Sequence, residues 1–358
     1  MGPTARIDLS ALRHNLQRAR ELAPGSRVYA VIKANAYGHG MLRVAPHLAG
    51  ADALAVARVE EAVKLRQAGI DRPILVLEGF FDAAELAAAS HYRLEVAVQQ
   101  PEQIALLHDN PLSHPLTCWL KIDSGMHRLG FQPDAVEAAW QALQDDPSVD
   151  KKVRLMTHLS SADDLSDPAT PTQLALFSRF ADRFGTECSV ANSAGIIGWP
   201  EARSDWIRPG IMLYGASPML GQTGEQIGLR SAMTLQSRLI AVNRFAKGSP
   251  IGYSGSWVCP EAMSVGVVAA GYGDGYPRHA PSGTPVLLNG QRVPLVGRVS
   301  MDMLNIDLRS QPDAKVGDPV TLWGEGLPAE EIAQHAGTIA YELFCGVTQR
   351  VQFEETNG

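Results

Sequence analysis

Eight short apolar runs recur in the first 213 residues, and this recurrence limits the possible folds more than any other feature. The segments between the runs, such as residues 59–68 and 101–108, have the apolar periodicity of helices. Apolar runs that alternate with helices are typical of βα units, which build parallel sheets. The eight runs are residues 28–32, 54–57, 74–77, 94–98, 116–122, 153–158, 188–192 and 206–213.

Eight βα units favour a TIM-type (β/α)8 barrel, in which catalytic groups lie at the C-terminal ends of the strands. A doubly wound sheet is the alternative. Its G-x-G-x-x-G fingerprint is missing from the first loop, which reads KANAYGHG at residues 33–40. Residues 8–22 predict a helix ahead of the first strand, with Asp8 as its N-cap.

The pattern changes near residue 231, where strand-like runs separated by turn signals replace the alternation with helices. One late helix is predicted, at residues 328–335. A chain of 358 residues exceeds the size at which a single core stops growing, so we expect two domains. These are a barrel at residues 1–230 and a β-rich domain at residues 231–358. The predicted late strands are residues 233–240, 265–270, 284–288, 293–296, 304–308 and 319–322.

Composition argues against several classes of protein. The formal net charge of −7 disfavours a nucleic-acid binder, which would present a basic face. The four cysteines have neither CxxC nor metal-ligand spacing, so we expect no metal site and no disulfide framework. The sequence has no signal-peptide pattern and no apolar stretch long enough to span a membrane. These features predict a cytoplasmic protein without a membrane or nucleic-acid partner.

Lys33 directly follows the first apolar run, and two interpretations of it are open. It is either a solvated lysine at a strand end, which its position alone favours, or an amine held in a pocket. A catalytic amine has to be partly desolvated and needs a carbonyl partner such as pyridoxal phosphate. That cofactor also requires a phosphate site, a partner for its pyridine nitrogen and a clamp for the substrate carboxylate.

Candidate side chains for these tasks follow the later runs. The segment ANSAG places Ser193 after the seventh run, and RPGIMLYG places Arg208 and Gly210 at the eighth, where barrels commonly bind phosphate. Arg128 follows the fifth run, and His158 ends the sixth. Taken singly, each of these residues is more often a turn, a solvated loop residue or a hydrogen-bonded structural residue.

Six motifs follow one another along the chain: AVIKANAYGHG, WLKIDSGMHRLG, DWIRPGIMLYG, GYSGSW, AAGYGDGYPR and VGRVSMDM. In this order they resemble the motifs of the alanine racemase family, and the resemblance covers essentially the whole chain. The resemblance implies a racemase, an isomerase dependent on pyridoxal phosphate that interconverts L-alanine and D-alanine. Such an enzyme supplies D-alanine as a peptidoglycan precursor or breaks alanine down, and the same chemistry serves both roles.

The resemblance also implies a two-base mechanism, with Lys33 and Tyr253 on opposite faces of the cofactor. Lys33 would bind pyridoxal phosphate covalently as a Schiff base. Tyr253 lies in the β-rich domain and would enter the site of a partner subunit, together with Met301 as a contact for the substrate carboxylate. The implied assembly is a head-to-tail homodimer with two composite active sites.

The same resemblance assigns the remaining site residues. Arg208 would face the pyridine nitrogen, with His158 between it and Tyr253 of the partner subunit. Arg128 would meet the phenolic oxygen of the cofactor and the substrate carboxylate. Lys121 matches a lysine that carries a carbamate in some family members. The phosphate contacts would be Tyr37, Ser193, Gly210 and Ile211, and the substrate channel would be lined by Asp163, Tyr272, Arg278 and Arg298.

One position departs from the family pattern, and three alternative functions are open. Some members have a phosphate-contacting tyrosine near the C-terminus, where the best match in this chain is Gln349. A racemase that also accepts serine is one alternative, because one added hydroxyl is hard to exclude by packing. A non-catalytic carrier of pyridoxal phosphate is disfavoured by the β-rich domain, and a decarboxylase is disfavoured by Arg208.

Overall fold

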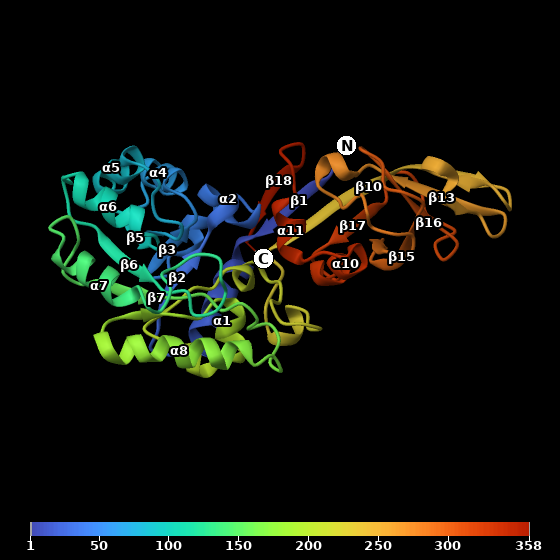
Figure 1. The fold of residues 1–358 in the computed structure, drawn as a ribbon. Coiled ribbons are helices and arrows are strands. Elements are labelled where there is room, and N and C mark those ends of the chain that lie inside the picture. The colour runs from blue at the N-terminus through green and yellow to red at the C-terminus, as the bar shows by residue number, and fades with distance from the viewer. Residues whose placement is uncertain (1, 358) are drawn as a thin grey trace.

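The computed structural model describes residues 2–357 and consists of a closed barrel and a β-rich domain (Figure 1). Eight parallel strands close the barrel in chain order, and the last of them pairs with the first. The predicted fold class is therefore confirmed. The barrel strands are β2 (Arg27–Val31), β3 (Ala53–Val56), β4 (Ile74–Val76), β5 (Glu95–Val98), β6 (Thr117–Lys121), β7 (Arg154–Met156), β8 (Cys188–Ser189) and β9 (Trp206–Ile207).

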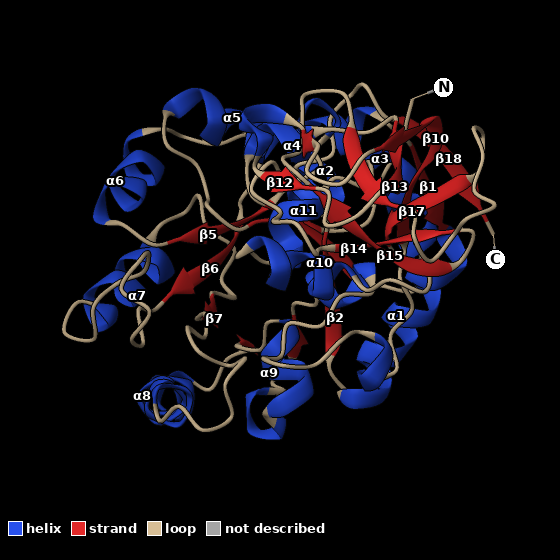
Figure 2. Cartoon of the chain, turned by 90° about the vertical axis from the view of Figure 1, so that its right-hand side faces the viewer, coloured by secondary structure: helices blue, strands red, loops and turns tan. Residues whose placement is uncertain are grey.

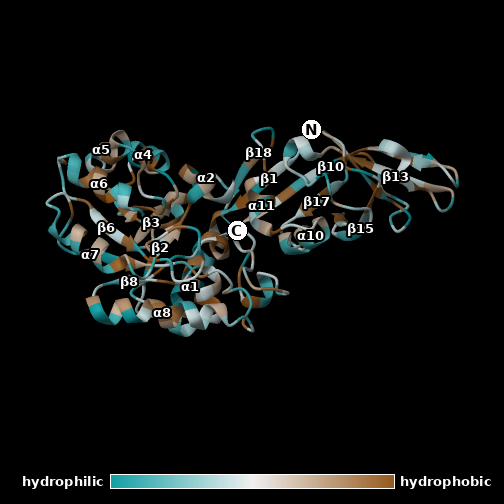
Figure 3. Ribbon diagram, in the orientation of Figure 1, coloured by the Kyte–Doolittle hydropathy of each residue, from teal (hydrophilic) through white to brown (hydrophobic). Residues whose placement is uncertain are grey.

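Helices surround the barrel, as the view in Figure 2 shows. Hydrophobic and hydrophilic stretches alternate along outer helices such as α8, so each can bury one face and expose the other (Figure 3). None of the described helices is both long and apolar enough to cross a membrane. The helices of this part are α1 (Leu9–Leu22), α2 (Lys33–Tyr37), α3 (Met41–Val44), α4 (Val59–Gln67), α5 (Ala83–His91), α6 (Pro101–Asp109), α7 (Val136–Asp145), α8 (Ala169–Phe184) and α9 (Ser193–Gly198).

Aromatic and charged side chains fill the N-terminal end of the barrel. Tyr29 stacks on Trp206 with ring centroids 4.2 Å apart, and Arg154 lies 3.1 Å from a carboxylate oxygen of Glu95. The same oxygen of Glu95 accepts a hydrogen bond from the indole of Trp119 at 3.0 Å. Because this end is filled, the C-terminal end is the one available for a binding site, as in other barrels.

The eighth barrel strand is shorter than the predicted run of residues 206–213. β9 ends at Ile207, and residues Ile211–Tyr214 form a 3-10 turn instead of a strand. Pro209 has no N–H to donate to a strand ladder, although its carbonyl accepts a hydrogen bond from Val31 at 3.0 Å. Arg208 and Gly210 therefore lie just beyond the strand end, at the mouth of the barrel.

The β-rich domain contains an eight-stranded sheet in the order β13-β16-β15-β14-β17-β10-β1-β18, in which β1 is Thr4–Asp8, and a separate two-stranded sheet of β11 and β12. Two helices, α10 (Ala329–Ala336) and α11 (Ala340–Cys345), follow β17, so the sequence predicts one of them and misses the other. The strands after the barrel are β10 (Met233–Phe245), β11 (Pro250–Ile251), β12 (Trp257–Val258), β13 (Met263–Val268), β14 (Pro285–Leu288), β15 (Gln291–Val296), β16 (Leu304–Asp307), β17 (Pro319–Trp323) and β18 (Gln352–Thr356).

The first strand, β1 (Thr4–Asp8), lies in the sheet of the β-rich domain, whereas the sequence places residues 1–230 in the barrel domain. It pairs antiparallel with β10 and parallel with β18. Ala5 and Ile7 are fully buried and alternate with half-buried polar residues, so residues 4–8 carry the alternation of a half-buried strand, a signal that the predicted domain boundary overlooks. The chain therefore begins in the second domain and enters the barrel through α1.

Replacing Asp8 by alanine is expected to lower the free energy of unfolding by about 1 kcal/mol. The Asp8 carboxylate accepts hydrogen bonds from the N–H groups of Ser10 (2.8 Å) and Ala11 (3.1 Å), and alanine leaves both unpaired. Asp8→Asn keeps an acceptor and should unfold in urea at the wild-type midpoint. An equal loss of stability in both variants would contradict the capping role.

Candidate active site

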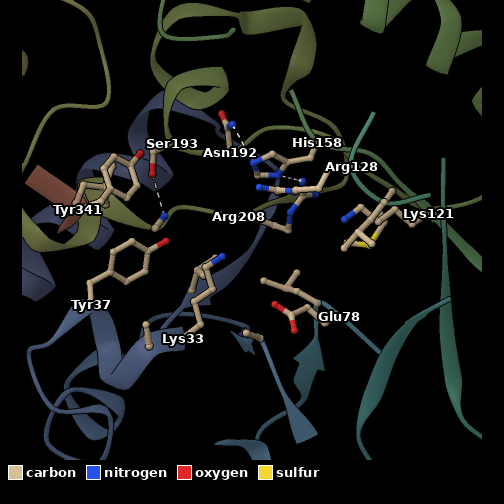
Figure 4. A pocket seen from close by; sticks show the side chains of 18 of the residues that line it. Lys33, Tyr37, Glu78, Lys121, Arg128, His158, Asn192, Ser193, Arg208 and Tyr341 are labelled. Atoms are coloured by element: carbon tan, nitrogen blue, oxygen red, sulfur yellow. Dashed lines mark hydrogen bonds between the residues drawn. The ribbon is translucent and has the colours of Figure 1, made fainter. Parts of the chain in front are cut away.

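One cavity of about 500 Å3 lies at the C-terminal ends of the barrel strands (Figure 4). Its walls come from the segments that follow β2, β3, β4, β6, β7, β8 and β9 and from helix α11, so residues far apart in the sequence face one space. The barrel residues that the resemblance assigns to the cofactor all line it, and so does the candidate carbamate lysine. They are Lys33, Tyr37, Lys121, Arg128, His158, Ser193, Arg208, Gly210 and Ile211.

Lys33 begins a left-handed turn that follows β2. Ala34, Asn35, Ala36 and Tyr37 have φ angles of 52°, 53°, 55° and 50°, a conformation that costs a non-glycine residue about 1–2 kcal/mol. The turn directs both Lys33 and Tyr37 into the cavity (Figure 4). Lys33 is therefore an amine in the wall of a pocket rather than a solvated strand end.

Two polar side chains within the KANAYGHG segment hold the left-handed turn. Asn35 Oδ1 accepts a hydrogen bond from the N–H of Met41 at 2.8 Å. His39 Nδ1 lies 3.1 Å from the carbonyl oxygen of Ala36 and 2.9 Å from that of Tyr37, so this nitrogen carries the proton. Burial lowers the pKa of His39 to about 4, and the ring is neutral at physiological pH.

Arg208 is buried behind the cavity, where it joins the ends of β7 and β8. Its guanidinium donates hydrogen bonds to the carbonyls of Thr157 (2.6 Å) and Val190 (3.1 Å) and to the hydroxyl of Ser189. One guanidinium nitrogen lies 3.5 Å from Nδ1 of His158. Burial lowers the pKa of Arg208 to about 10, which leaves it charged at neutral pH. Burial, and then Arg208, lower the pKa of His158 and keep that ring uncharged.

Hydroxyl and backbone N–H groups meet at one end of the cavity. Ser193 Oγ accepts hydrogen bonds from the N–H groups of Gly210 (2.9 Å) and Met212 (3.4 Å). A Cβ atom on residue 210 would lie 2.4 Å from the hydroxyl of Tyr37, so a side chain there would displace the Tyr37 ring. Hydroxyls beside the N–H groups of a turn are the donors with which proteins bind phosphate.

Positive charge exceeds negative charge along the cavity wall. Lys33, Lys121, Arg128 and Arg208 line the cavity, and Glu78 is the only carboxylate among the described residues that do so. Burial, and then Arg128, lower the pKa of Lys33, whereas burial and the two arginines lower that of Lys121 to about 8. The cavity therefore favours anionic ligands such as a phosphate and a carboxylate.

Tyr341 also lines the cavity, although no sequence motif indicates it. Its ring centroid lies 5.9 Å from that of Tyr37, and Figure 4 shows it beside Ser193. Burial, and then Asp163, raise its pKa to about 12. Gln349 is exposed and is not among the residues that line the cavity. The C-terminal tyrosine at this end of the cavity is thus Tyr341, which lies on the unpredicted helix α11.

The candidate residues of the β-rich domain lie outside the cavity of their own chain. Tyr253 is 66% exposed and Met301 is 51% exposed. Figure 1 shows the segment near residue 250 at the end of the domain away from the barrel. A single chain therefore does not bring Tyr253 to Lys33.

The candidate substrate-channel residues fall into two groups. Tyr272 lies next to Met301, because its N–H donates a hydrogen bond to the carbonyl of Ser300 at 3.0 Å. Arg298 lies beside the loop of Tyr253, since a Cβ on Gly252 would be 3.5 Å from the backbone nitrogen of Arg298. Arg278 is on the β-rich domain as well. Asp163 is on the barrel, where it lines a neighbouring cavity of about 840 Å3 with His158 and Tyr341.

Two family models together match almost the entire chain. Residues 7–218 match the N-terminal domain of alanine racemase, and residues 232–354 match its C-terminal domain. The alanine racemase of Nitrosococcus oceani is 57% identical over 349 residues, which cover 98% of both chains. The chain belongs to the alanine racemase family.

Solved structures agree with this assignment. The biosynthetic alanine racemase of Pseudomonas aeruginosa is 44% identical with a TM-score of 0.96, and the match covers 99% of each chain. The alanine racemase of Bartonella henselae, with covalently bound pyridoxal phosphate, is 26% identical with a TM-score of 0.90 over 99% of this chain and all of that one. The protein is an isomerase that racemises alanine. The comparisons support neither the wider substrate range nor the non-catalytic carrier.

Proposed function

We propose that Lys33 and Tyr253 of a partner subunit are the two opposed bases of this racemase, with pyridoxal phosphate bound covalently through Lys33. The observation that carries the proposal is that Lys33 shares one cavity with a group of hydroxyl and backbone N–H groups and with more positive than negative side chains. The residues present fit the cofactor. Tyr37 and Ser193 suit its phosphate, and the lack of a side chain at Gly210 lets the Tyr37 hydroxyl lie close to this backbone.

Five residues of this chain would hold the phosphate and one would face the ring. When bound, pyridoxal phosphate supplies an electron-withdrawing ring that stabilises negative charge on the substrate α-carbon. Arg208 would face the ring nitrogen and, because it stays protonated, would leave that nitrogen without a proton and limit the withdrawal. Weaker electron withdrawal by the ring favours return of a proton to the α-carbon of the substrate. The phosphate contacts would be Tyr37, Ser193, Gly210, Ile211 and Tyr341.

Lys33 Nζ is suited to accept a proton, because burial and Arg128 lower its pKa and make its neutral form more accessible. Racemisation also needs a proton donor on the opposite face of the substrate. Tyr253 is exposed, and the segment near residue 250 lies at the end of the β-rich domain away from the barrel (Figure 1), which suits entry of Tyr253 into a second copy of the chain in a head-to-tail homodimer. His158 would then lie between Arg208 and the partner's Tyr253 as an uncharged relay.

Arg128 and Met301 of the partner subunit would bind the substrate carboxylate. Arg128 supplies a planar guanidinium on the cavity wall, which suits a carboxylate. The contact of the Tyr272 and Met301 loops supports a shared role for them at the opening of the site. The substrate channel would be lined by Asp163 together with Tyr272, Arg278 and Arg298 of the partner subunit.

We further propose that the enzyme acts in the cytoplasm and supplies D-alanine. All four cysteines are free in the structure, which suits a reducing compartment. The similar Pseudomonas aeruginosa enzyme is a biosynthetic alanine racemase.

A two-base mechanism predicts that the α-proton of alanine exchanges with solvent and that the configuration of the α-carbon inverts in the same reaction. In deuterated water the protein with bound pyridoxal phosphate is expected to deuterate the α-carbon of L-alanine and to form D-alanine, followed by NMR and chiral chromatography. Lys33→Ala should lose the absorbance of the lysine-linked cofactor. Tyr253→Phe should retain that absorbance and lose turnover by about 100-fold or more. Deuteration without inversion in the wild type would remove Tyr253 from the chemistry, and absence of both would contradict the proposed function.

A composite site predicts complementation between inactive subunits. After random mixing of Lys33→Ala and Tyr253→Phe subunits, half of the dimers carry one intact site, so activity should return to about one quarter of the wild-type value. A mixture of Lys33→Ala with the double variant is the control and should stay inactive. Failure to regain activity although the subunits exchange would place Tyr253 outside the partner's site.

Lys121 is proposed to carry a carbamate that orients Arg128. Its pKa of about 8, lowered by burial and by the arginines, makes the neutral amine accessible for addition of carbon dioxide. Because the amine is protonated below this pKa, the carbamate NMR signal from 13C-labelled bicarbonate should grow as pH rises from about 6 to about 9. Lys121→Ala should lose the signal, and a variant of the exposed Lys151 should keep it. An unchanged signal in Lys121→Ala would contradict the assignment.

A further inference from the structure

One carboxylate connects the ends of two barrel strands beside Lys33. Glu61 lies in the first turn of α4 and is half-buried. Its Oε1 accepts a hydrogen bond from the N–H of Ala34 at 2.8 Å. Its Oε2 accepts hydrogen bonds from the N–H groups of Ala57 (2.8 Å) and Arg58 (3.3 Å). Both oxygens are therefore used, and they reach two different segments.

The position of these two segments gives the contact its importance. Ala34 directly follows Lys33, Ala57 directly follows β3, and both line the cavity. The last backbone hydrogen bond between the two strands runs from Ile32 to the carbonyl of Ala55 at 2.8 Å. Glu61 thus continues the connection between β2 and β3 beyond the point where the strand ladder ends.

Capping of α4 accounts for only half of this arrangement. A capping box needs one oxygen, which here receives the N–H of Arg58 at the N-cap position. The other oxygen accepts a hydrogen bond from the N–H of Ala34, the first of the four residues with positive φ angles. A run of residues in that conformation persists only where its surroundings hold it, and Glu61 holds it from a different βα unit.

We propose that Glu61 is a positioning residue whose carboxylate fixes the backbone next to Lys33 and so sets the direction in which the lysine enters the cavity. The inference rests on the proposed role of Lys33. Glu61 itself is not among the described residues that line the cavity, so it acts on Lys33 and not on the substrate. Its hydrogen bond to Ala34 positions the lysine, and its charge partly opposes the lowering of the Lys33 pKa.

The variant pair Glu61→Gln and Glu60→Gln tests this role. Both remove one negative charge from the first turn of α4, but Glu60 is exposed and serves as the matched control. An amide has a single acceptor oxygen, so the side chain of the Glu61→Gln variant can hold one of the two segments and not both. Full-length protein is first examined without added cofactor, by hydrogen exchange of a peptide that spans residues 33–38.

Exchange of this peptide is expected to be about tenfold faster in Glu61→Gln than in the wild type, and unchanged in Glu60→Gln. With pyridoxal phosphate bound, kcat for alanine should fall about tenfold in Glu61→Gln, because small misplacement of a reacting group slows chemistry. KM should stay within about twofold of the wild-type value, since the carboxylate does not line the substrate cavity.

Two results would overturn the proposal. One is equal exchange of the peptide in the two variants, whatever the change in kcat, because a loss of kcat alone would come from the charge of Glu61 on Lys33 and not from the position of the backbone. The other is a loss of activity in Glu61→Gln that is accompanied by a lower melting temperature and faster exchange throughout the protein, because that pattern indicates general destabilisation. If the wild type fails to racemise alanine, the proposed function fails, yet the exchange comparison still decides whether Glu61 holds the turn.

Discussion

Closure of the barrel is the constraint on which the rest of the site depends. Because β2 pairs with β9, the residues that follow the first and the last strand lie side by side. Lys33 and Tyr37 thereby face Arg208 and Gly210 across one cavity. The filled N-terminal end, with Tyr29, Trp206 and their charged neighbours, leaves the opposite end as the place for chemistry.

The mouth of the barrel combines two unfavourable features that the surrounding structure has to offset. The turn after Lys33 is left-handed at four non-glycine residues, and the side chains of Asn35, His39 and Glu61 hold it by hydrogen bonds. Arg208 is a buried cation, stabilised by carbonyl groups at the ends of two strands. Both features bring reactive groups into a partly desolvated space, which strengthens their interaction with an anionic ligand.

The β-rich domain contributes helix α11, with Tyr341 and Cys345, to the cavity of its own barrel, and its strands give the chain a second surface. β1, which precedes the barrel in the chain, pairs with β10, which follows the barrel, in the sheet of the β-rich domain. Tyr253 lies beyond β10 in the chain and is exposed. Met301 and Tyr272 are exposed on the same domain. The proposed homodimer explains this exposure, because each barrel then receives from a second copy the residues that its own chain keeps at a distance.

The sequence by itself determined the alternation of strands and helices and the motifs at the strand ends, because apolar periodicity and loop motifs are local properties. It therefore predicted the barrel and the barrel residues of the cavity, Lys33 and Arg208 included. The pairing of β1 and the positions of Tyr341 and Glu61 were decided only by the tertiary structure, since each depends on a partner far away in the chain. The lowered pKa values of Lys33 and Lys121 likewise required the fold, because burial and neighbouring charges exist only after the strands have closed.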